Sequence, residues 1–106
     1  MIDARQWDIG KYNPVDFETI TVSTSAIGLT PTKVDPGTSQ KRKRAFISVE
    51  NNRIRFTFDG TTPTSTVGHI LVPTQTFLFE GFYQLNQLQF IRVDSADAII
   101  QVSYLI

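Results

Sequence analysis

Residues 45–60, AFISVENNRIRFTFDG, decide the fold that this chain is expected to adopt. Apolar and polar residues alternate on both sides of Asn51-Asn52. This pair can adopt the left-handed backbone of a two-residue turn, although less readily than Asn-Gly would. A β-hairpin with that turn places Ile47 opposite Phe56 and makes one side of the hairpin wholly apolar. The stretch therefore predicts a hairpin in a β-sheet.

The other side of this predicted hairpin is polar and basic. Its pairs are Glu50 with Arg53 and Ser48 with Arg55, and opposite charges across two strands contribute roughly 0.2–1 kcal/mol per pair. Phe46 falls on the same polar side. Exposed aromatic and arginine side chains are common in interfaces, so this side is the predicted docking surface.

The rest of the chain is typical of an all-β protein, because apolar residues recur with period two in runs rich in β-branched and aromatic types. We expect one antiparallel β-sandwich of about seven strands, jelly-roll-like, over residues 17–106. Residues 1–16, interrupted by Pro14, are expected to form an extended N-terminal arm. No helix is expected. In addition to the two strands of the hairpin, strands are predicted at 17–23, 67–72, 76–80, 85–93 and 98–105, with a short extended piece at 27–30.

The predicted strand 85–93 does not keep its apolar residues on one face. Leu88 and Phe90 fall on one side, whereas Ile91 and Val93 fall on the other. A β-bulge near Phe90 would reconcile them. The alternative is a strand that is buried on both faces.

Composition argues against an active site or a metal centre. The chain has 106 residues, no Cys and one His, so zinc could be held only if several copies each contributed His69. His69 has hydroxyls before it but no acid nearby in the sequence, and a catalytic His needs both a nucleophile and an orienting group. Asp94 and Asp97 alone indicate a calcium site only weakly. We expect no enzyme activity and no cofactor.

No apolar run is long enough to span a bilayer, and the N-terminus lacks the pattern of a signal peptide. The expectation is therefore a soluble protein with no membrane partner.

Charge is unevenly distributed along the chain. Segment 41–55 carries six basic residues against one acid, Glu50, while the whole chain has a net charge of zero. Such a dipolar surface favours association between copies. The run Lys41-Arg42-Lys43-Arg44 is interpreted as a protein–protein contact or as a solvated loop that protects the adjoining hairpin from wrong pairing. Nucleic acid is not expected as a partner, because no other basic residues continue a binding track.

Two aromatic residues of the arm, Trp7 and Tyr12, are candidate interface anchors. They could instead be pinned to their own domain, with the arm folded over Phe46. The predicted interface residues are Trp7, Tyr12, Lys41, Arg42, Lys43, Arg44, Phe46, Arg53 and Arg55.

From residue 17 onward the chain resembles a group of small β-sandwich proteins encoded among the virion genes of tailed bacteriophages. The resemblance rests on ITVSTSAIGLTPT, AFISVENNRIRFTFDGTTPTSTVGH, TFLFEG and LQFIRVDSADAIIQVSYL, with the signature Arg-x-x-x-Asp-Gly-x-x-Pro-Thr-x-x-x-Gly-His at Arg55 to His69. The signature consists of turns and strand edges, so its functional specificity is modest. This chain departs from the group at Asn51-Asn52, where a Gly is common. The arm and the basic run fall outside the resemblance.

The resemblance implies a non-enzymatic virion component made in the cytoplasm of the bacterial host. The foremost expectation is a capsid decoration (cement) protein that stabilises the head through repeated contacts with the major capsid protein or other virion proteins, and that forms homo-oligomers. The alternatives are a tail or head–tail accessory protein, or a carbohydrate-binding host-attachment module. That module would need an aromatic platform, for which Trp7, Tyr12, Tyr83 and Phe46 are candidates.

Overall fold

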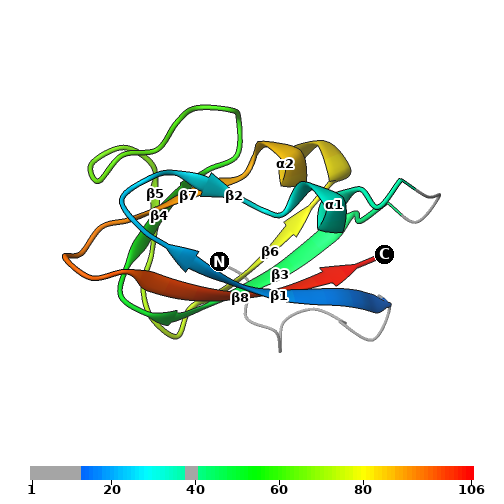
Figure 1. The fold of residues 1–106 in the computed structure, drawn as a ribbon, viewed down its shortest axis with the longest axis horizontal. Coiled ribbons are helices and arrows are strands. Elements are labelled where there is room, and N and C mark those ends of the chain that lie inside the picture. The colour runs from blue at the N-terminus through cyan, green and yellow to red at the C-terminus, as the bar shows by residue number, and fades with distance from the viewer. Residues whose placement is uncertain (1–12, 38–40) are drawn as a thin grey trace.

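The computed structural model describes residues 13–37 and 41–106. Strands dominate this part of the chain, and two short helices lie together at one end of it (Figure 1). The strands are β1 (Pro14–Val22), β2 (Ile27–Gly28), β3 (Arg44–Asn51), β4 (Ile54–Thr57), β5 (His69–Leu71), β6 (Thr76–Glu80), β7 (Gln89–Arg92) and β8 (Ala98–Leu105), and the helices are α1 (Pro31–Val34) and α2 (Phe82–Gln87).

The strands form two four-stranded antiparallel sheets. Sheet A has the order β1-β8-β3-β6, and sheet B has the order β2-β7-β4-β5. The first strand pairs with the last, the second with the second-last, and so on inward to β4 with β5. This nesting is the pattern of an eight-stranded ribbon wrapped into a jelly roll. The predicted all-β, jelly-roll-like sandwich is confirmed, with the short extended piece counted as a strand.

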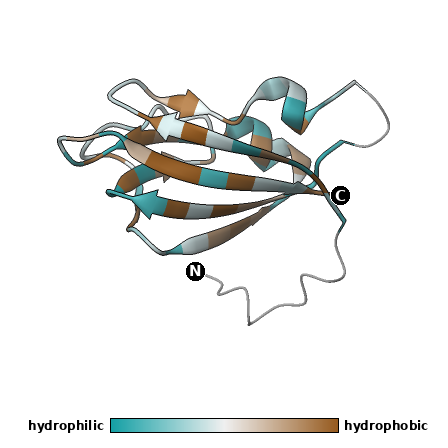
Figure 2. Ribbon diagram, turned by 60° about the horizontal axis from the view of Figure 1, so that its bottom comes forward, coloured by the Kyte–Doolittle hydropathy of each residue, from teal (hydrophilic) through white to brown (hydrophobic). Residues whose placement is uncertain are grey.

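The core lies between the two sheets and is built from alternate residues of each strand. On β8 the inward residues Ala98, Ile100, Val102 and Tyr104 are all fully buried, as the period-two pattern predicts. Hydrophobic and hydrophilic bands alternate along the strands of sheet A in Figure 2. Burial of a large apolar side chain such as that of Ile100 contributes about 1.5–3 kcal/mol, so the alternation directs the fold.

The predicted hairpin of residues 45–60 is wrong. β3 and β4 lie in different sheets, and each pairs with other strands. Asn52 does have the expected positive φ of 59°, but the chain crosses there from sheet A to sheet B. Glu50 accepts a hydrogen bond from Gln101 at 3.0 Å and does not pair with Arg53. The alternation identifies the buried face of each strand, and both sheets bury their inner face, so it cannot identify the pairing partner.

The expectation of no helix is also wrong. Pro31 begins α1, where its fixed φ suits the first turn of a helix. α2 occupies the first part of the predicted strand 85–93, and β7 begins only at Gln89. Leu85 and Leu88, three residues apart, both face the core, which is the spacing of a helix. β7 then pairs with β4 without a register shift, so there is no bulge at Phe90.

The predicted boundary between the N-terminal arm and the sandwich, at residue 17, is three residues too late, because β1 begins at Pro14. Pro14 pairs with Leu105, and the neighbouring Asn13 and Ile106 exchange two backbone hydrogen bonds of 3.2 and 3.0 Å. Proline has no N–H to donate to a neighbouring strand, so it is restricted to positions such as the first residue of an edge strand, which Pro14 occupies. Of the predicted arm, residues 1–12 lie outside the described residues.

A polar cluster ties the segment before α1 to sheet A. The Glu18 carboxylate accepts hydrogen bonds from the Thr30 hydroxyl at 2.6 Å and from the Tyr104 hydroxyl. Tyr104 is fully buried, and this burial, with the nearby Glu18 charge, raises the pKa of its phenol. Neither of the two helices in the described ranges is long and apolar enough to cross a membrane.

Candidate functional site

The predicted interface residues Trp7 and Tyr12 lie outside the described residues. In the basic run, Lys41 and Lys43 are exposed. The Lys41 ammonium lies 5.1 Å from the centre of the Phe82 ring and 3.9 Å from Asp35. These two lysines can therefore meet a partner.

The two arginines of the basic run are less accessible. Arg42 is buried, and its backbone N–H donates to the carbonyl of Val34 at 3.0 Å. Arg44 is half-buried, with its Nε 3.6 Å from the Glu80 carboxylate. Both side chains belong to the packing at this end of sheet A rather than to an open basic patch.

Arg53 holds the β7–β8 loop. It donates to the Asp94 carboxylate through its backbone N–H at 2.9 Å and through its guanidinium at 2.7 and 3.0 Å. These hydrogen bonds hold the pKa of Asp94 below its usual value. Asp94 and Asp97 each face an arginine, because Arg92 donates to Asp97 at 2.6 Å. Within residues 13–37 and 41–106, no three acidic or histidine side chains gather as metal ligands would.

Arg55 braces the loop between β4 and β5, residues 58–68. Its guanidinium donates to the carbonyl oxygens of Ser65 at 2.9 Å and Gly68 at 2.7 Å. The predicted docking surface is therefore divided: Arg53 and Arg55 belong to the sheet B side, whereas Phe46 lies on sheet A.

Phe46 lies on the outer face of sheet A, in a row of paired residues that crosses all four strands. Phe17 pairs with Ser103, Ser103 with Phe46, and Phe46 with Leu78. Phe17 is 53% exposed, Phe46 is half-buried and Leu78 is only 7% exposed. We define the docking face as Phe17, Phe46, Lys41 and Lys43.

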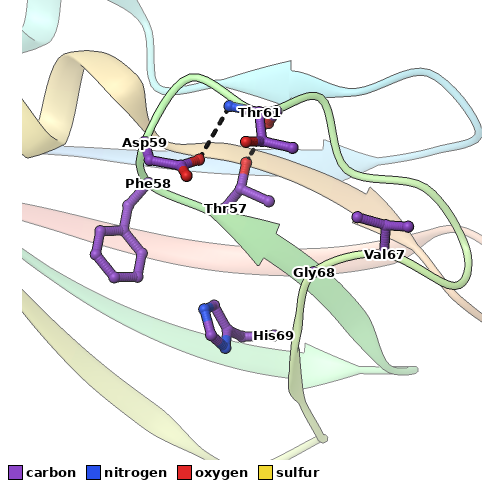
Figure 3. A pocket seen from close by; sticks show the side chains of 7 residues that line it. All are labelled: Thr57, Phe58, Asp59, Thr61, Val67, Gly68 and His69. Carbon is purple, nitrogen blue, oxygen red and sulfur yellow. Dashed lines mark hydrogen bonds between the residues drawn. The ribbon is translucent and has the colours of Figure 1, made fainter.

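A second surface, which sequence reasoning missed, lies where β4 and β5 meet the braced loop. Phe58, Asp59, Val67 and His69 line a depression of about 400 Å³ there. In Figure 3, Asp59 and Thr61 lie along one side of it, His69 lies across from them, and Phe58 and Val67 lie at the two ends. We call this depression the Phe58–His69 groove.

Aromatic side chains form one wall of this groove. Phe58 is stacked on His69, with ring centres 5.8 Å apart and planes at 27°. Phe56 lies 5.3 Å from His69 and contacts Phe79 edge-on at 5.3 Å. Such pairs contribute about 0.5–1.5 kcal/mol beyond simple burial, so the exposed rings rest on a firm aromatic base.

A second depression of about 400 Å³ adjoins the first and shares Phe58 and His69 with it. Its other lining residues include Ile70, Gln75 and Phe77. The two depressions together follow the open edge between β5 of sheet B and β6 of sheet A.

The polar side of the groove is fixed by local hydrogen bonds. The Asp59 carboxylate accepts from the Thr61 backbone N–H at 3.0 Å, and this bond holds the pKa of Asp59 below its usual value. The Thr57 hydroxyl donates to the Thr61 carbonyl. Asp59 is therefore an ionised acceptor in a set position at neutral pH.

The backbone at Gly68 permits the loop to lie close to β4. Its φ is +128°, and a Cβ there would come within 3.0 Å of the Phe56 carbonyl. Only glycine combines this conformation with this approach.

The sequence pattern does not assign the groove residues to a site. It assigns Phe58 to the apolar face of the hairpin, whereas Phe58 is 39% exposed at the open edge. It also gives His69 no acid nearby, whereas Asp59 lines the same groove. The available signal was that Asp59, Gly68 and His69 all belong to the Arg55–His69 signature.

No protein-family model, curated protein or solved structure matches this chain.

Proposed function

We propose that this chain is a non-enzymatic structural protein of a tailed-bacteriophage virion, and that it acts as a capsid decoration protein. One observation carries the proposal: three residues of the signature of the resemblance, which spans Arg55 to His69, act as scaffolding. Arg55 braces the loop, Gly68 permits its close approach and Asp59 closes its first turn. A signature made of such residues suits a protein that binds through its shape.

The fold supports the same proposal by analogy. Eight-stranded jelly rolls are common in viral capsid proteins, and also in lectins. A fold alone does not fix a function, so the analogy only raises the weight of the resemblance.

The docking face is the proposed contact with the capsid. Phe17 offers a large exposed apolar side chain at the β1 edge of sheet A, and Lys41 and Lys43 offer positive charge where β3 begins. An aromatic anchor flanked by charge is a common composition of interfaces. The expected partner is the major capsid protein, and the expected arrangement is many copies with identical contacts.

The test is binding of the purified full-length chain to capsids, measured by co-sedimentation, together with mass spectrometry of purified virions. We expect the chain in virions, and we expect Phe17→Ser to reduce co-sedimentation at least tenfold. Tyr83→Ser is the matched control, because Tyr83 is also an exposed aromatic residue but lies on α2. Absence from purified virions would overturn the proposal, and equal binding by both variants would overturn the docking face.

A further inference from the structure

We propose that the Phe58–His69 groove is a carbohydrate-binding site, in which one sugar ring packs on the aromatic wall and bonds to Asp59. The inference goes beyond capsid binding and uses a different surface. Its chemistry does not depend on the proposed function; only the direction in which the groove would face in a virion rests on it.

The aromatic wall suits a flat ring with an apolar face. The near-parallel stack of Phe58 and His69 is supported by Phe56 and Phe79 from the core side. A pyranose presents a face of C–H groups, and the negative face of an aromatic ring attracts such weakly positive hydrogens. Phe58 keeps 39% of its surface exposed, so part of its surface is open to a ligand.

The polar groups select the class of ligand. Asp59 can only accept hydrogen bonds, whereas a threonine hydroxyl and an imidazole can both donate and accept. Sites for cations are lined mainly by acceptors, and sites for anions are lined mainly by donors. Thr61 and His69 lie across the groove from each other with Asp59 beside Thr61 (Figure 3), so a neutral polyol finds both kinds of group.

The dimensions favour more than one sugar ring. Two adjoining depressions of about 400 Å³ share the Phe58–His69 wall, and ligand sites commonly span about 300–1,000 Å³. Gln75 in the second depression accepts from the Val72 N–H at 2.8 Å through Oε1. Its amide NH₂ is a donor for a second ring.

The groove is preorganised, which reduces the entropy cost of binding. Arg55 fixes the loop at Ser65 and Gly68, and Thr57 ties the other end of the loop to Thr61. Asp59 and His69 are thus held on opposite sides of the groove before any ligand arrives.

The Phe58–His69 groove lies beside β4 and β5 of sheet B, whereas the aromatic residues of the docking face belong to β1 and β3 of sheet A. Phe17 and Phe46 lie on the outer face of sheet A, whereas the braced loop lies on the sheet B side (Figure 1). A copy bound to a capsid through sheet A would leave the groove open to the surroundings. Bacterial surface glycans are the ligands that it would then meet.

The first test is a glycan array probed with the labelled full-length chain, followed by titration with the glycan that gives the strongest signal. We expect binding by the wild type, a loss of at least tenfold for Phe58→Ala, and a loss of about tenfold for Asp59→Asn. Asp59→Asn keeps the shape of the exposed side chain, so it remains informative if Phe58→Ala is unstable. Ile27→Ala, which removes an exposed apolar side chain on β2, should bind like the wild type.

Two outcomes would overturn the inference: no glycan bound by the wild type, or equal affinities for wild type, Phe58→Ala and Asp59→Asn. Capsid co-sedimentation separates this inference from the proposed function. If Phe58→Ala loses capsid binding and the wild type binds no glycan on the array, the groove is a capsid contact and only the carbohydrate site is wrong. If the array is positive but the chain is absent from virions, the carbohydrate site stands and the virion role is wrong.

Discussion

The side chain of Arg55 is bonded to the backbone of Gly68, with 2.7 Å between Nη1 and the carbonyl oxygen. The two residues are thirteen positions apart and bracket the loop that carries Phe58, Asp59 and Val67. A second bond joins Arg55 Nε to the Ser65 carbonyl at 2.9 Å. One arginine therefore sets the position of the loop on sheet B.

Arg55→Ala should destabilise the protein by about 1.5–3 kcal/mol, because a hydrogen bond from a charged group contributes roughly that much and the loop carbonyls lose their donor. Urea denaturation measures the loss. Amide hydrogen exchange in residues 61–68 should accelerate more than exchange in β8. Arg55→Lys should not restore the loop, since an ammonium lacks the planar fork that reaches two carbonyls.

Arg53→Ala is the matched control for this change. The Arg53 side chain is 47% exposed and the side chain of its partner Asp94 is 30% exposed, and ion pairs that water reaches contribute little to stability. The bracing role of Arg55 is wrong if Arg53→Ala costs as much, or if exchange in residues 61–68 is unaltered in Arg55→Ala.

Gly68→Ala should destabilise by about 2–4 kcal/mol, because the new methyl group meets the Phe56 carbonyl at 3.0 Å in a backbone conformation that alanine disfavours. Gly37→Ala separates the effect of the close contact from the effect of the backbone conformation. Gly37 also has a positive φ, of 79°, but nothing lies within 4 Å of its added Cβ, so it should cost only about 1 kcal/mol. Thermal or urea denaturation measures the loss in the free energy of unfolding for both variants. Similar losses at both positions would show that the close approach at Gly68 is unimportant.

Tyr104→Phe should destabilise by about 1–2 kcal/mol, because it removes a buried donor to the Glu18 carboxylate while the ring still fills its place in the core. Glu18 would keep its bond from Thr30. Tyr83→Phe, at a residue that is 74% exposed, should alter the free energy of unfolding by less than about 0.5 kcal/mol. Equal effects would mean that the Glu18–Tyr104 bond contributes no net stability.

Burial could be predicted from the sequence more fully than pairing could. The inward residues Ile100 and Val102 of β8, and Ile47 of β3, follow from period two, because alternate side chains of a strand share one face. In a jelly roll, however, β3 and β4 belong to opposite sheets. Both bury their apolar faces in the same core, so their patterns also fit a hairpin between them.

The groove could not be predicted because it depends on how distant elements close around one edge. Phe58 and His69 are stacked because β4 pairs with β5 in a register that places His69 opposite Phe56, two residues before Phe58. The sequence shows that Arg55 alternates outward, but not that its partners are two carbonyls of a later loop. Phe77 joins the second depression from sheet A, which no local pattern indicates.

Acid should lower the free energy of unfolding partly by protonating Asp94. Arg53 lowers the pKa of Asp94 in the folded state, so the stabilisation is present above the unfolded pKa of about 3.9. It is lost as the pH falls through the lower folded value. The drop in the free energy of unfolding between pH 7 and pH 3, measured in urea, should be smaller for Asp94→Asn than for the wild type. Identical drops would contradict the linkage.

Two double-cysteine variants distinguish the jelly roll from the hairpin, and the natural chain contributes no cysteine of its own. Ser48 and Gln101 are paired across β3 and β8, within the Cα separation that a disulfide requires. Ser48→Cys/Gln101→Cys should therefore oxidise to a disulfide without loss of cooperative unfolding. Ser48→Cys/Arg55→Cys, the pair that the hairpin would join, should keep both thiols free, because stacked sheets lie about 10 Å apart and both residues face outward. Thiol titration after mild oxidation measures how many cysteines remain free in each variant. A disulfide in the second variant alone would show that residues 45–60 form the hairpin after all.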